Sequence, residues 1–136
     1  MRVEPYLAFD GTCAEAFRMY AKILGGKLDL MTHGNSPMAE QTPADQRERI
    51  MHAHLEIGGG AVVMGSDAPP QYFTKPQGFS VSIGVTQTSE GERIFQALSE
   101  GGEIKMPFAK TFWAAGFGMC IDRFGIPWMV SSEKEG

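Results

Sequence analysis

The sequence contains little that would tie it to a membrane, a nucleic acid or an oxidising compartment. Only two of its 136 residues are cysteines, and they do not form a CxxC motif. No apolar run approaches the ~20 residues of a transmembrane helix, and the first residues lack the layout of a signal peptide. The net charge of -4 argues against a nucleic-acid or anionic-membrane partner. We therefore expect a cytoplasmic protein without either partner, in which Cys13 and Cys120 are reduced, buried thiols.

A turn for binding a nucleotide or a methyl donor is also missing. Such a turn is rich in glycine and leads from a strand into a helix, so that the helix-terminal amides reach the ligand. The glycine run at residues 58–60 joins two strand-like segments instead. It predicts a hairpin turn, and on this ground we expect no methyltransferase activity.

What the sequence does contain is an internal repeat. Thr12 and Glu15 form a predicted capping box at the start of one helix, and Ser89 and Glu92 form another. Ser89 follows Thr12 by the same number of residues as Glu92 follows Glu15. Apolar residues then recur at helical spacing in both segments. Paired glycines, residues 25–26 and 101–102, are expected to end the two helices.

The segments around the two helices repeat as well. Strand-like runs at 3–9 and 79–85 precede the helices, and strand–turn–strand patterns at 51–66 and 116–131 follow them. The polar segment 35–49 lacks strand patterning, so we expect a loop or a short irregular helix there.

These patterns predict one α+β domain over residues 1–136, built from two β-α-β-β-β modules. Module one covers residues 1–67 and module two covers residues 79–132, and a proline-rich linker, residues 68–78, joins them. Neither module is expected to bury its own apolar face alone, so the two should share a core.

Paired modules of this kind resemble the vicinal oxygen chelate superfamily, which includes glyoxalase I, extradiol dioxygenases and fosfomycin- and bleomycin-resistance proteins. Segments 5–26, 54–67 and 101–131 resemble, more narrowly, PhnB-like proteins. The resemblance implies a glyoxalase-like fold, in which the two modules form a cupped mixed sheet around a pocket. It also implies a homodimer.

The resemblance further implies where a metal would bind in related enzymes: one ligand from the first strand and one from the last strand of each module. The corresponding residues here are Val3, Met64, Ser80 and Met129. None offers the carboxylate or imidazole that hard divalent cations require. We therefore expect no metal and no cofactor.

Strand alternation predicts which side chains line the pocket. With Met129 facing inward, Phe117 and Met119 of the neighbouring strand should face the same way. Trp113 and Phe112 are expected at the entrance, and the pattern leaves open which of them points inward. The full set of expected ligand-binding residues is His54, Met64, Ser80, Ser82, Trp113, Phe117, Met119 and Met129. Self-filling of the cavity, or a dimer interface, remains the alternative.

His52, His54 and Glu56 occupy alternate positions and should share one face of a strand. They indicate either a metal or acid–base site or an ordinary polar strand face. His54 is the best candidate for a catalytic residue, although the sequence does not reveal which face it occupies.

Three functions are compatible with the sequence. The first is binding of a small organic molecule in a metal-free apolar cavity. The second is a divalent-metal-dependent or His-based enzyme, of lyase, isomerase or dioxygenase type, acting on a small oxygenated substrate. The third is a dimeric interaction protein with a vestigial cavity.

The first prediction concerns metal content. Because Val3, Met64, Ser80 and Met129 lack hard ligands, elemental analysis of the purified protein should find no stoichiometric divalent metal bound there. One metal ion per chain, lost when Met64 or Met129 is replaced by leucine, would contradict this expectation.

Overall fold

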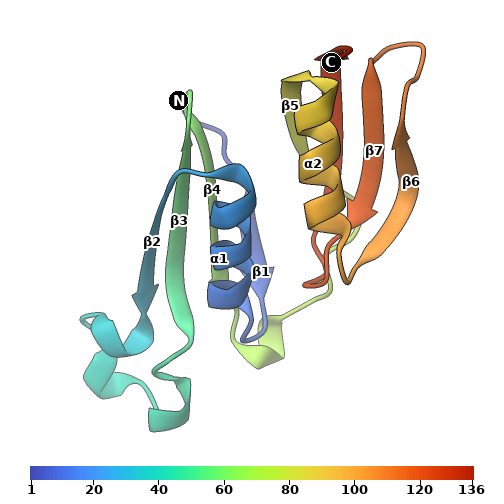
Figure 1. The fold of residues 1–136 in the computed structure, drawn as a ribbon. Coiled ribbons are helices and arrows are strands. Elements are labelled where there is room, and N and C mark those ends of the chain that lie inside the picture. The colour runs from blue at the N-terminus through green and yellow to red at the C-terminus, as the bar shows by residue number, and fades with distance from the viewer. The chain divides into compact units, whose positions relative to one another are not determined.

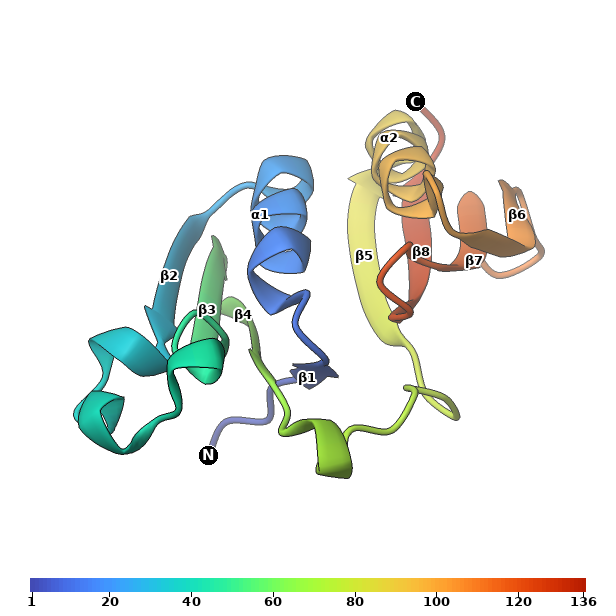
Figure 2. The same cartoon turned by 90° about the horizontal axis from the view of Figure 1, so that it is seen from below.

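The computed structural model describes residues 1–136 and divides them into two compact units, residues 1–74 and 75–136. Each unit carries one helix against a four-stranded sheet, as Figures 1 and 2 show. Unit 1 consists of β1 (Tyr6–Phe9), α1 (Cys13–Leu24), β2 (Lys27–Thr32), β3 (Ile50–Gly58) and β4 (Ala61–Asp67). Unit 2 consists of β5 (Val81–Gln87), α2 (Thr88–Ser99), β6 (Glu103–Ala109), β7 (Gly116–Ile121) and β8 (Pro127–Lys134).

The two sheets have the same topology. Their strand orders are β1-β4-β3-β2 and β5-β8-β7-β6. The first strand of each unit pairs parallel with the last, and the remaining neighbours pair antiparallel. The predicted α+β fold with repeated β-α-β-β-β modules is therefore confirmed. Neither helix is long and apolar enough to cross a membrane.

The polar segment of unit 1 between β2 and β3 forms three short 3-10 turns: His33–Asn35, Ala39–Gln41 and Ala44–Gln46. They connect β2 to β3 at one end of these strands (Figure 1). In unit 2 the corresponding connection, between β6 and β7, is only residues 110–115. The expectation of a loop or short irregular helix is thus confirmed.

Each helix buries its apolar side against one face of its sheet. In unit 1 Phe17 is fully buried and packs edge-on against Phe9 and Tyr20, with ring centroids 6.0 and 5.5 Å apart. In unit 2 the ring of Phe95 approaches the backbone of β7 at Gly118. A Cβ atom at Gly118 would lie 2.7 Å from a Phe95 ring carbon, so this position requires glycine.

The predicted capping boxes are wrong. Thr12 is the N-cap residue of α1, but its side chain makes no capping hydrogen bond. Instead Asp67, at the end of β4, accepts the backbone N–H groups of Gly11 (2.8 Å) and Cys13 (3.1 Å) at one carboxylate oxygen. Its other oxygen accepts the N–H of Ile50 (2.8 Å). A buried carboxylate from the last strand has therefore replaced the local cap.

In unit 2 the helix begins at Thr88, with Gln87 as its N-cap, so Ser89 cannot cap it. The last strand again reaches the helix start. The Thr88 hydroxyl donates to the carbonyl of Lys134 (2.7 Å) and, since its proton is used there, accepts from the Ser132 hydroxyl (2.8 Å).

A second buried carboxylate, Asp122, organises the turn between β7 and β8. One oxygen accepts the backbone N–H groups of Phe124 (2.8 Å) and Ile126 (3.0 Å), and the other accepts the indole N–H of Trp128 (2.8 Å). Gly125 lies in this turn with a φ of 94°, a left-handed conformation that favours glycine. The strand–turn–strand pattern predicted at 116–131 is confirmed.

The fold generates a stability prediction at Asp67. Replacing it by alanine leaves three backbone N–H groups without their charged acceptor, so unfolding in urea should show a loss of about 3 kcal/mol or more. Asp67→Asn keeps one acceptor oxygen and should lose less. The exposed Asp45→Ala is the control and should stay within about 0.5 kcal/mol of wild type. An equally small effect of Asp67→Ala would show that the carboxylate does not hold the helix start.

Candidate functional site

Because each helix covers one face of its sheet, functional side chains can lie only on the other face, which we call the helix-free face. In β3, Ala53 and Leu55 are fully buried beneath α1. The intervening residues His52, His54 and Glu56 therefore lie together on the helix-free face of unit 1. This resolves which face of its strand His54 occupies.

Tyr6, Met64 and His54 form one row across that face. Met64 pairs with Tyr6 of β1 on one side and with His54 of β3 on the other. The Tyr6 hydroxyl lies 3.3 Å from Nδ1 of His52, and the two rings are tilted with centroids 5.8 Å apart. The ring centroids of His52 and His54 are 6.4 Å apart. Three side chains with acid–base chemistry thus gather around Met64.

The sequence pattern does not predict Tyr6 as a site residue. A count from the end of the first strand predicts Val3 in its place, but Val3 precedes β1 and is 90% exposed. The available signal was alternation, because Leu7 and Phe9 are the apolar residues facing α1 and Tyr6 must then face the other way. The first strand is shorter than its sequence pattern, which made a count from its end unreliable.

Unit 2 presents a largely apolar helix-free face. Met129 pairs with Met119 of β7 and with Ser82 of β5, while Trp128 and Val130 are buried beneath α2. Phe117 pairs with Ser131 on the same face. Ser82, rather than Ser80, is the β5 hydroxyl beside Met129, since Ser80 lies before the strand begins.

An aromatic ladder extends this face into the loop between β6 and β7. Trp113 packs edge-on against Phe117 with a centroid distance of 5.4 Å, and Phe112 packs edge-on against Trp113 at 4.7 Å. Phe112 is 97% exposed and Trp113 is 56% exposed. Of the two, it is therefore Trp113 that lies against the strand residues, with Phe112 outside it.

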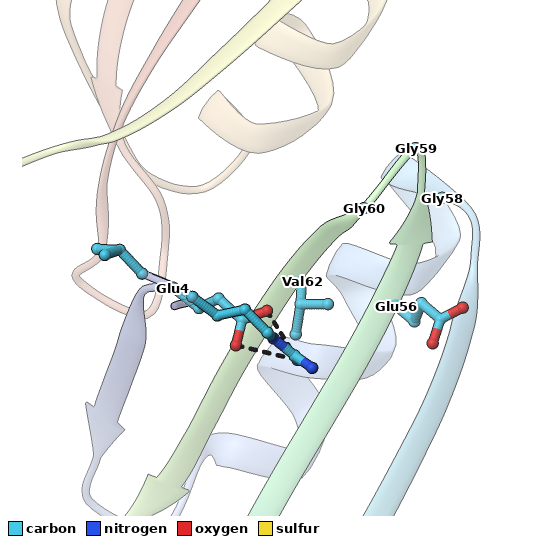
Figure 3. A pocket seen from close by; sticks show the side chains of 8 residues that line it. Glu4, Glu56, Gly58, Gly59, Gly60 and Val62 are labelled. Atoms are coloured by element: carbon cyan, nitrogen blue, oxygen red, sulfur yellow. Dashed lines mark hydrogen bonds and ion pairs between the residues drawn. The ribbon is translucent and has the colours of Figure 1, made fainter.

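A pocket of about 470 Å³ lies at the β3–β4 turn of unit 1, lined by the N-terminal segment and the glycine run. Figure 3 shows Glu4 beside Val62 over β4, with Glu56 on the neighbouring strand. Glu4 forms an ion pair with Arg2 at 3.1 Å, whereas Glu56 makes no ion pair. Glu56 is accordingly the carboxylate available to a molecule entering this pocket.

A second pocket of unit 1, about 650 Å³, lies beside the 3-10 turns and includes His33, Arg49 and Asp67. Its charged groups are already used within the chain. The Arg49 guanidinium donates to Asp10 (3.0 Å) and to the carbonyl of Ala68 (2.7 Å), and Asp67 accepts the three N–H groups described above. We therefore assign this pocket a structural role.

The side chains around Met64 and Met129 are poor ligands for a hard cation. No three histidine, cysteine, aspartate or glutamate side chains come together in the structure. The neighbours of Met64 and Met129 in the first strands are a phenol, Tyr6, and a hydroxyl, Ser82. Two thioethers with these partners do not supply the anionic oxygen ligands that Mg²⁺ or Mn²⁺ prefers.

Neither cysteine is placed to act as a nucleophile. Cys13 and Cys120 are both unpaired and buried. Burial, with a smaller contribution from the nearby Asp67 carboxylate, raises the pKa of the Cys13 thiol to about 12. Burial likewise raises the pKa of Cys120. A thiol that stays protonated is unreactive, since the thiolate is the nucleophile.

The fold defines the class of protein first. The chain is similar to a glyoxalase/bleomycin resistance protein/dioxygenase domain from Frankia sp. EAN1pec, with a TM-score of 0.65, 15% identity and 98% of each chain covered. At this identity the likeness concerns the fold alone. It agrees with the repeated β-α-β-β-β units, and the chain has the glyoxalase-like fold of the vicinal oxygen chelate proteins.

The family follows from closer matches. The sequence model of the family described as 3-demethylubiquinone-9 3-methyltransferase matches residues 1–131, and the chain belongs to this PhnB-like family. It is 35% identical to protein YjdN of Escherichia coli (strain K12), over 99% of this chain and 97% of that protein.

Two solved structures share the fold of this chain. Protein PA1353 from Pseudomonas aeruginosa is 46% identical, with a TM-score of 0.90 and coverage of 100% of this chain and 99% of that chain. A putative 3-demethylubiquinone-9 3-methyltransferase, PhnB protein, from Bacillus cereus is 22% identical, with a TM-score of 0.78 and coverage of 97% and 99%. The predicted resemblance to PhnB-like proteins is confirmed.

The raised pKa of Cys13 predicts how stability depends on pH. The folded chain holds this thiol protonated, whereas the unfolded chain releases its proton near pH 9, so the stabilisation is complete below that pH. It should be lost as the pH rises from about 9 towards about 12. Thermal unfolding across this range should show a shallower decline for Cys13→Ala than for wild type. Parallel declines for the two proteins would contradict the assignment.

Proposed function

We propose that this protein binds a small, mainly apolar organic molecule at the helix-free face of unit 2, without using a hard metal cation. The observation that carries the proposal is the helix-free face of unit 2, in which exposed Trp113 and the half-buried Phe117, Met119 and Met129 adjoin one another. Aromatic rings and flexible thioethers suit an apolar ligand, because they provide contact area that adapts to its shape.

Two polar groups on the same face would orient such a ligand. These are the hydroxyls of Ser82 and Ser131, which pair with Met129 and Phe117. An apolar wall with a small number of polar groups is the usual composition of a site for a small organic molecule.

The family description names a methyltransferase, but the local geometry gives this activity no support. Gly58, Gly59 and Gly60 have positive φ values in the hairpin between β3 and β4, away from any helix start. At the helix starts, Asp67 accepts the N–H of Cys13 in α1, and the carbonyl of Gly136 accepts the N–H of Ser89 in α2. Neither helix start follows a glycine-rich turn of the kind that binds such a cofactor.

A second candidate function is a histidine-based enzyme acting on a small oxygenated substrate. The hydrogen bond between Tyr6 and His52 favours it, since such a bond orients an imidazole for proton transfer. His54 stays the predicted catalytic residue in that case, with His52 added beside it. An interaction protein with a vestigial cavity is the third candidate. The expected homodimer and the cytoplasmic location remain predictions.

Ligand binding can be tested with ANS, a dye whose fluorescence rises when it binds an apolar surface. Trp113 is 56% exposed on the proposed site. ANS added to the native protein should bind there with increased dye fluorescence. Trp113→Ala or Met129→Glu should weaken dye binding about tenfold, which corresponds to about 1.4 kcal/mol.

Tyr72→Ala is the matched control, because Tyr72 is an exposed aromatic residue outside both sheets. It should bind ANS as wild type does. If Met129→Glu and Trp113→Ala bind the dye unchanged while remaining folded by circular dichroism, the proposed site is wrong. If instead Met129→Glu converts a dimer to a monomer, the face is an interface and the third candidate holds.

A further inference from the structure

Tyr6, His52 and His54 form a cluster whose chemistry the proposed apolar site does not use. His52 and His54 are alternate residues of β3, so both imidazoles project from the helix-free face of unit 1. Their ring centroids lie 6.4 Å apart. Neither imidazole forms a salt bridge, and the one hydrogen bond of the pair joins Nδ1 of His52 to the Tyr6 hydroxyl at 3.3 Å.

This spacing suits a single metal ion. A transition-metal ion binds imidazole nitrogen at about 2.0–2.1 Å, so small rotations of the two side chains bring one nitrogen of each ring to the same ion. Metal-bound histidines commonly donate their second ring N–H to an oxygen, which orients the ring and raises its basicity. The Tyr6 oxygen is placed to accept from Nδ1 of His52, which leaves Nε2 for the metal.

The neighbouring side chains select the kind of metal. Met64, which pairs with both Tyr6 and His54, adds a soft thioether to the two imidazoles. Imidazole and thioether ligands suit copper, nickel and zinc and disfavour magnesium and calcium. Among divalent first-row ions, copper binds such nitrogen donors most tightly. His52, His54 and Met64 therefore suit a transition-metal cation of intermediate softness, although they disfavour a hard cation such as Mg²⁺.

We propose that His52 and His54 bind one divalent transition-metal ion, with Cu²⁺ preferred over Ni²⁺ and Zn²⁺, and that Tyr6 positions His52 for this purpose. The proposal is independent of the apolar ligand site, which lies on Trp113, Phe117, Met119 and Met129. Metal binding is accordingly tested with the metal alone.

The experiment titrates the full-length protein with Cu²⁺ in a non-coordinating buffer, with calorimetry for affinity and electron paramagnetic resonance for ligand identity. One Cu²⁺ should bind per chain, with hyperfine splitting from two imidazole nitrogens. His52→Gln or His54→Gln removes the chelate, so either should weaken binding roughly 100-fold and remove one nitrogen from the spectrum. Tyr6→Phe should weaken it about tenfold, the usual effect of losing an outer partner.

His33→Gln is the matched control, because His33 lies in the first 3-10 turn, outside the cluster, and should leave Cu²⁺ binding unchanged. Far-ultraviolet circular dichroism confirms that each variant is folded. Equal affinities of wild type, His52→Gln and His54→Gln, or a spectrum unchanged by both substitutions, would overturn the proposal. An equal affinity for Mg²⁺ would overturn the assignment of the metal class.

Discussion

The structure depends on one constraint: each sheet has a single helix, and the helix can cover only one of its faces. Strand side chains alternate between the two faces, so every second residue is committed to the core and the others face away. In β3 this separates Ala53 and Leu55 from His52 and His54, and in β8 it separates Trp128 and Val130 from Met129. The helix-free faces are therefore where functional side chains can be placed without disturbing the core.

The last strand of each unit holds the start of the helix of that unit, but the two units use different side chains to do so. In unit 1 the buried carboxylate of Asp67 holds the start of α1 and the start of β3. In unit 2, hydroxyl groups and a backbone carbonyl connect Thr88 to β8. In both units a group at the start of the helix, an N–H in one and a hydroxyl in the other, donates its hydrogen bond to a residue distant in sequence. The helices are thereby attached to the strand that carries Met64 or Met129.

The sequence was sufficient for the fold because its repeat, glycine stops and alternation are local signals. It placed Met129, Met119 and Phe117 on one face, as the structure has them. It failed at the helix caps and at Tyr6. Asp67 lies far from Thr12 along the chain, so no local motif shows it as the capping group. Strand register, which makes Tyr6 the neighbour of Met64, depends on pairing that a count along one strand cannot supply.

The central proposal is that the helix-free face that carries Met129 binds an organic molecule and holds no hard cation. Native mass spectrometry of the freshly purified protein, compared with its Met129→Glu variant, tests this claim most directly. The account predicts wild-type chains carrying a small organic molecule and no magnesium, manganese or iron, with that molecule lost from the variant. A hard divalent ion on the wild-type chain, or an organic adduct equally present on the variant, would contradict it.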